Sequence, residues 1–128
     1  MAADFSREQV DAFIVAEIDS VPHLEALLIL WNCRPEARSV DEIAKLLYVP
    51  RELAAKVLAD LTGRGLLVAG EGVSHRYQSR SQETDNLMRN VEAMHRLELI
   101  RISGLIHSKA SAAVRDFARA FRFKKDRD

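Results

Sequence analysis

The chain has 128 residues, 48% of them hydrophobic, which is enough for one domain with a sizeable core and excludes a disordered chain. No apolar run reaches the roughly 18 residues that a membrane-spanning helix needs. The first twenty residues carry five acidic side chains and lack the basic start and apolar block of a secretory leader. We therefore expect a soluble, cytoplasmic protein.

The net charge is zero but unevenly distributed. Residues 1–42 hold nine acidic and three basic side chains, a balance of −6, and residues 43–128 hold ten acidic and sixteen basic ones, a balance of +6. Such a division allows one part of the chain to attract a polyanion that the other part repels. An ordinary solvated surface is the simpler interpretation.

The single cysteine, Cys33, excludes an internal disulfide framework. It lies close to Trp31 at the end of an apolar helix, where a cysteine is expected to pack as a small hydrophobic side chain. A redox-sensing thiol beside Arg34 is the alternative.

Two helices are expected first. Ser6 and Gln9 have capping-box spacing, and apolar residues at helical spacing predict a helix over residues 7–18, within an N-terminal unit over residues 1–19. Ser20 and Pro22 begin a second helix, whose apolar stripe ends at Trp31.

Two helices separated by a tight turn follow. Ser39 and Glu42 form a second capping box, which begins a short helix. Pro50 disfavours helical geometry at the residue before it and suits a helix start, so a longer helix is expected from Arg51 to Gly63 or Gly65.

A short hairpin comes next. An apolar run over residues 66–69, a Gly70-Glu71-Gly72 turn and an alternating segment over residues 75–78 predict two antiparallel strands. The fold class expected is mainly α with a small β-hairpin.

Residues 39–79 resemble the winged helix-turn-helix domain, and in particular that of MarR-like bacterial transcriptional regulators, and we expect the whole domain to span residues 20–80. The resemblance rests on Ile43-Ala44-x-Leu46-Leu47, on Tyr48-Val49-Pro50, on Leu61-x-x-x-Gly65-Leu66-Leu67 and on the Gly-Glu-Gly hairpin tip. It covers about a third of the chain, and Tyr48 occupies a place that is often Gly. It implies a winged helix-turn-helix with flanking dimerisation helices.

The resemblance also implies a DNA-binding surface, with the helix after Pro50 in the major groove and the wing on the backbone or in the minor groove. The implied contacts with double-stranded DNA are Arg51, Glu52, Ala55, Lys56, Arg64, His75, Arg76 and Arg80.

An alternative function is protein docking. Residues 50–64 hold three cations and two anions, so this helix can neutralise few DNA phosphates. Leu53 and Ala55 are poor at reading bases by hydrogen bonds, and they suit a module that docks on another regulator or on the transcription machinery without binding DNA.

A long helix is expected over residues 83–107, within a segment spanning residues 81–108. Apolar residues recur there at steps of three and four, the spacing of a coiled-coil seam, and the resemblance implies a homodimer through flanking helices. A monomer in which this helix is fully packed, folded back over the N-terminal helix of the same chain, is the alternative. The seam residues are Met88, Val91, His95, Leu99, Ile102 and Ile106.

Residues 109–128 hold seven basic and three acidic side chains, and a helix is expected over about residues 111–121. A charged tail on a docked helix is the simpler interpretation, and a contact with phosphates or an acidic partner is the alternative.

An enzyme is not expected. Glu92-x-x-His95 has the spacing of half of a di-iron site, but no second copy occurs, and no phosphate loop or nucleophile motif is present. We assign no metal and no cofactor. Trp31, Tyr48 and Met94 are candidates to line an effector pocket, but no ligand is assigned.

Overall fold

The computed structural model describes residues 7–108. In chain order the elements are α1 (Arg7–Glu17), α2 (Val21–Cys33), β1 (Arg38–Ser39), α3 (Val40–Leu47), α4 (Arg51–Gly63), β2 (Leu67–Ala69), β3 (Ser74–Tyr77) and α5 (Gln82–Leu97). A further helix begins at residue 99 and runs to residue 108. The fold is mainly helical with a small antiparallel sheet, as expected. No helix within residues 7–108 is both long and apolar enough to cross a bilayer.

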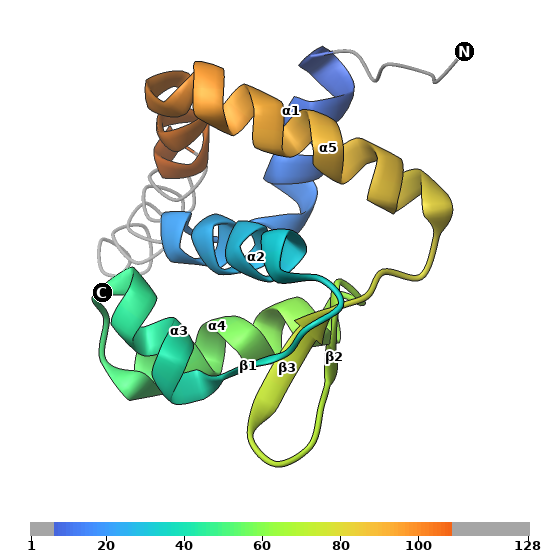
Figure 1. Cartoon of the computed structure of the whole chain (residues 1–128). Coiled ribbons are helices and arrows are strands. Elements are labelled where there is room, and N and C mark those ends of the chain that lie inside the picture. The colour runs from blue at the N-terminus through green and yellow to red at the C-terminus, as the bar shows by residue number, and fades with distance from the viewer. Residues whose placement is uncertain (1–6, 109–128) are drawn as a thin grey trace, which may run out of the picture.

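The central element is α2, which runs through the middle of the molecule. In Figure 1, α1, α5 and helix 99–108 lie on one side of it, and α3, α4 and the strands lie on the other. Because α2 is surrounded in this way, its side chains are buried nearly all round, including Leu24, Leu27 and Leu30.

The capping box predicted for α3 is confirmed. Ser39 Oγ accepts a hydrogen bond from the Glu42 backbone N–H at 3.1 Å, and Glu42 Oε1 accepts one from the Ser39 N–H at 3.1 Å. Helix α3 ends at Leu47, its C-cap Tyr48 has a left-handed backbone, and α4 follows with Pro50 as its N-cap. The two helices are therefore joined by a tight turn, as Pro50 indicated.

The sheet has three strands in the order β1–β3–β2, all antiparallel. The hairpin β2–β3 is confirmed, with Leu67 opposite Tyr77 and Ala69 opposite His75. The strand β1 was not expected, because no strand was predicted between the apolar stripe that ends at Trp31 and the helix that Ser39 begins. It places Arg38 opposite His75 and Ser39 opposite Ser74, which makes β3 the central strand.

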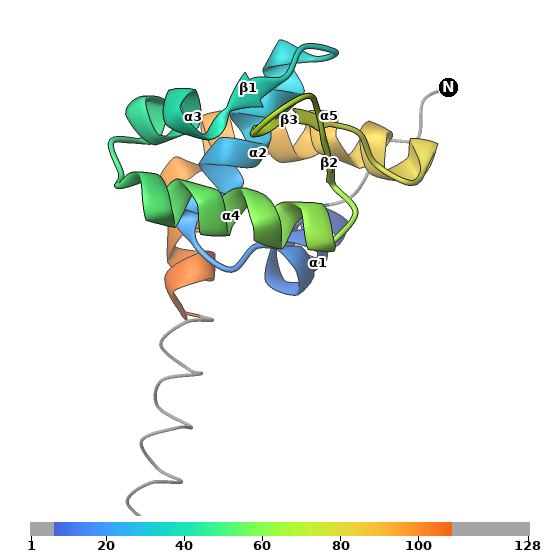
Figure 2. The same ribbon diagram turned by 90° about the horizontal axis from the view of Figure 1, so that it is seen from below.

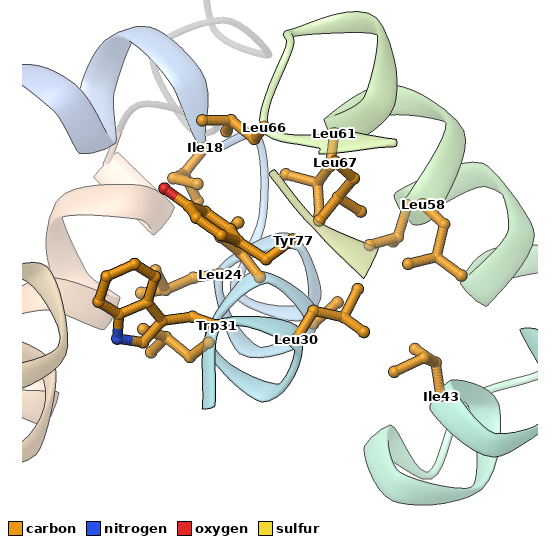
Figure 3. Close-up of a cluster of buried hydrophobic side chains, with 14 of the residues drawn as sticks. Ile18, Leu24, Leu30, Trp31, Ile43, Leu58, Leu61, Leu66, Leu67 and Tyr77 are labelled. Carbon is orange, nitrogen blue, oxygen red and sulfur yellow. The ribbon is translucent and has the colours of Figure 1, made fainter. Parts of the chain in front are cut away.

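The core joins the two sides of α2. The rings of Trp31 and Tyr77 meet edge to face, with centroids 5.0 Å apart and an interplanar angle of 84°. Figure 3 shows them beside Leu24, with Leu61 and Leu67 across the cluster. This packing connects the sheet to α2, so the hairpin is held at a defined position relative to the helices.

The single long helix predicted over residues 83–107 is wrong. Helix α5 ends at Leu97, Glu98 has φ −130° and ψ 45°, and a new helix starts at residue 99. Ion pairs hold the corner: Arg101 Nη1 lies 2.9 Å from Asp11 Oδ2, and Glu98 pairs with both Arg7 and Arg101. The bend allows both helices to bury apolar side chains on the same core.

The seam predicted along that helix is therefore not an exposed stripe. Met88, Val91 and Ile102 are 0% exposed and Ile106 is 1% exposed, all within the chain's own core. His95 is half-buried, and Leu99 alone of the six is an exposed apolar residue, at 51%. The helix and basic tail predicted over residues 109–128 lie outside the described residues.

Candidate functional site

The outer face of α4 is the candidate site. The helix buries Ala54, Val57, Leu58 and Leu61 against the core, because these residues recur at helical spacing. On the opposite face Arg51, Glu52 and Lys56 are exposed, and Ala55 is half-buried at the edge. The side chains of Arg51 and Lys56 are 57% and 69% exposed.

Each of these two cations has an acidic neighbour. Arg51 Nε lies 2.7 Å from Asp41 Oδ1 on α3, and Lys56 Nζ lies 2.9 Å from Asp60 Oδ2 one turn along α4. Exposed pairs of this kind contribute at most about 1 kcal/mol to stability. Both cations can therefore exchange their carboxylate for another anion at low cost.

Arg64, at the end of α4, is held differently. Its Nη2 donates to both carboxylate oxygens of Asp19, at 3.0 and 3.1 Å, and its Nη1 donates to the Ala16 carbonyl at 3.0 Å. The side-chain hydrogen bond to Asp19 raises the pKa of Arg64. This arginine fastens the end of α4 to the link between α1 and α2, away from Arg51.

The hairpin carries the other predicted contacts. Arg76 Nη2 donates to Gln78 Oε1 at 3.1 Å, and the Arg80 side chain lies against Gly65. His75 has a buried Nδ1 with no hydrogen-bond partner among the described atoms, and burial lowers its pKa. The imidazole is therefore neutral at neutral pH and adds no charge to the hairpin.

A polar contact that the sequence analysis missed connects α4 to α2. His23 is 5% exposed; its Nε2 lies 2.8 Å from Asp60 Oδ2, and its Nδ1 lies 2.5 Å from Ser20 Oγ. The hydrogen bond with His23, followed by that from Lys56, lowers the pKa of Asp60. The sequence analysis expected Ser20 and Pro22 to begin this helix, but it did not predict the contact between Ser20, the N-cap of α2, and the His23 ring.

Asp19, His23 and Asp60 have ligand atoms that all lie within 4.8 Å of one another, which is close enough to hold a metal ion. Arg64 already occupies both oxygens of Asp19, and Lys56 and His23 both contact Asp60 Oδ2. Because protein cations neutralise these carboxylates, the cluster is best described as an ion-pair network.

Two of the residues considered for an effector pocket, Trp31 and Tyr48, line different hollows. Trp31 lines a cavity of about 330 Å³ between α2, β3 and the start of α5. Tyr48 lines a separate shallow groove of about 590 Å³ at the turn between α3 and α4. The structure therefore does not bring Trp31 and Tyr48 into one site.

No protein-family model matches the chain, and no curated protein matches its sequence. Among solved structures the chain is similar to the crystal structure of RV1404 from Mycobacterium tuberculosis, with 19% sequence identity and a TM-score of 0.48. The similarity covers 88% of this chain and 82% of that one.

Proposed function

We propose that the chain is a winged helix-turn-helix regulator that binds double-stranded DNA as a homodimer. The order of elements from α2 to β3 is helix, strand, helix, helix, strand, strand, with the strands arranged β1–β3–β2. The three helices followed by the β2–β3 hairpin support this proposal, in which α4 is the recognition helix and the β2–β3 hairpin is the wing.

The observation that carries the proposal is the accessibility of α4. Figure 2 views the molecule from below, and α4 lies at the front with α2 behind it. Arg51 and Lys56 are exposed on this helix and are paired only with exposed or half-exposed carboxylates. A phosphate can therefore replace Asp41 or Asp60 as their partner.

The number of available cations limits the affinity. Arg51, Lys56, Arg76 and Arg80 remain as candidate phosphate or base contacts, whereas Arg64 is engaged with Asp19. Each phosphate neutralised contributes about 0.9 to the slope of log K against log salt concentration. A small slope is expected for one chain and about twice that slope for a dimer.

The homodimer in this proposal uses a different surface from the predicted seam. Leu97, Leu99 and Ile100 are 82%, 51% and 88% exposed at the corner between α5 and helix 99–108. We refer to these three residues as the apolar corner. Three large apolar side chains exposed so close together are typical of a surface that associates with another chain.

A gel-shift assay tests DNA binding. Purified protein is mixed with labelled genomic fragments at low and moderate salt, and a salt-sensitive complex is expected. The Arg51→Ala/Lys56→Ala variant is expected to lose most of the binding. Arg96→Ala is the matched control, because Arg96 is a 76% exposed cation on α5 with only a 4.0 Å contact to Glu92. If no fragment forms a salt-sensitive complex, the proposal is refuted.

Protein docking is the second candidate function. Leu53 is 38% exposed on the same face of α4, and Tyr48, in the turn between α3 and α4, is 95% exposed. Exposed apolar and aromatic side chains of this kind are enriched where proteins meet. If no DNA fragment shifts, this alternative is favoured.

A further inference from the structure

Tyr48 has an unfavourable backbone conformation. Its φ of 57° and ψ of 46° lie in the left-handed region, and it is the one non-glycine residue with positive φ in the described range 7–108. Its N–H bonds to the Ala44 and Lys45 carbonyls, so it closes the end of α3 as a C-terminal cap. Glycine adopts this conformation without steric conflict, whereas in tyrosine the Cβ lies too close to the backbone carbonyl oxygen.

The ring of Tyr48 does nothing to offset this strain. It is 95% exposed, and its hydroxyl makes no hydrogen bond within the part of the chain that the structure describes. The side chain therefore adds neither packing nor a polar contact to the fold. A residue that is strained and exposed at once points to a role outside the fold.

The surroundings of Tyr48 show what the ring can meet. Tyr48 and Lys45 line the same shallow groove, together with Ala44, Val49 and Pro50. Lys45 is exposed and has no ion pair among residues 7–108. Pro50 is the N-cap of α4, so the phenol and the ammonium flank the start of the proposed recognition helix.

We propose that Tyr48 and Lys45 form a contact with the phosphate backbone of double-stranded DNA, with the Tyr48 hydroxyl donating to a phosphate oxygen and Lys45 supplying positive charge. Tyrosine and lysine are both regular donors to DNA phosphates. The inference rests on the proposed function. It adds two residues that were not among the predicted contacts, and it accounts for tyrosine at a position that favours glycine.

The test measures stability and DNA binding on the same variants of the full chain. Tyr48→Gly is expected to raise the melting temperature, because the strain is removed. The same variant is expected to bind about tenfold more weakly to a DNA fragment that the wild type binds. Tyr48→Phe keeps the strain and the ring but removes the hydroxyl, so its loss of DNA affinity is expected to be nearly as large as that of Tyr48→Gly. Lys45→Gln is expected to lower the salt slope by about 0.9.

The outcomes separate this inference from the proposed function. If the wild type forms no salt-sensitive complex, both are overturned. If the wild type binds and Tyr48→Gly binds equally well, the Tyr48 contact alone is overturned. If Tyr48→Gly loses binding but also melts at a lower temperature than the wild type, Tyr48 acts through folding and the contact is again overturned. Arg96→Ala is the control for loss of a remote cation.

Discussion

The Nε2 atom of His23 lies 2.8 Å from Oδ2 of Asp60, so the first turn of α2 is hydrogen-bonded to the third turn of α4. The other ring nitrogen is satisfied by Ser20 Oγ. In the neutral imidazole with hydrogen on Nε2, Nε2 donates to Asp60 and Nδ1 accepts from the Ser20 hydroxyl. Both polar atoms of a buried side chain thus have partners, and the contact fixes α4 against the core.

The first prediction concerns this contact. Asp60→Ala leaves a ring nitrogen of the buried His23 without its partner, so the free energy of unfolding is expected to fall by about 1–3 kcal/mol. Urea unfolding measures this change. Lys56→Ala removes the other partner of Asp60. Because the Lys56 side chain is 69% exposed, the free energy of unfolding is expected to change by no more than about 0.5 kcal/mol. Equal effects of the two substitutions would contradict the role assigned to His23.

The second prediction concerns pH. Burial lowers the pKa of His75 in the folded state below its ordinary value of 6.5. At a pH between the lowered pKa of the folded state and the ordinary pKa of the unfolded chain, the unfolded chain binds the proton and the folded chain does not. His75 therefore makes the fold less stable as the pH falls through that window. His75→Phe keeps an aromatic ring in β3 and removes the titration.

The measurement is the free energy of unfolding at several values between pH 7 and pH 5. The wild type is expected to lose more stability across this range than His75→Phe, since the two proteins differ only at residue 75. At pH 7 the variant is expected to be no less stable, because the unpaired Nδ1 is gone. Identical pH profiles would show that His75 does not titrate differently on folding.

The third prediction compares two glycines near the end of α4. Gly65 has φ +78°, and an added Cβ would lie 2.7 Å from Nε of Arg80, so Gly65→Ala is expected to destabilise the fold by about 1–2 kcal/mol. Gly63 is helical, and nothing lies within 4 Å of an added Cβ. Gly63→Ala is expected to stabilise the fold by up to about 1 kcal/mol. Thermal unfolding of both variants measures the difference, and the same sign for both would contradict it.

The fourth prediction concerns the apolar corner. Leu97→Glu/Ile100→Glu places two charges where a partner chain is proposed to pack, so light scattering is expected to show a dimer for the wild type and a monomer for the variant. These side chains are 82% and 88% exposed, so no large loss of monomer stability is expected.

Met88→Ala serves as the contrast to the corner variant. Met88 is fully buried, and its truncation is expected to destabilise the fold by about 2–5 kcal/mol. A wild-type protein that is monomeric at every concentration would refute the dimer, and a corner variant that still dimerises would refute the apolar corner as the dimer surface.

Much of the local structure was predictable because its causes lie within a few residues of one another. Ser39 and Glu42 cap the same helix turn, Pro50 determines where α4 begins, and Gly65 allows the chain to leave α4 and enter the hairpin. The exposed face of α4, with Arg51 and Lys56, followed from the same helical spacing. The sequence by itself determined these elements and their order.

The tertiary structure decided the rest, because the causes are far apart in the chain. Nothing in the sequence around Glu98 breaks a helix; the bend is accompanied by burial of Ile102 and by the pairing of Arg101 with Asp11, 90 residues earlier. Likewise, Arg64 was expected at DNA but pairs with Asp19, 45 residues away. Helical periodicity shows which side chains share a face, but the partner that covers that face depends on how distant segments pack.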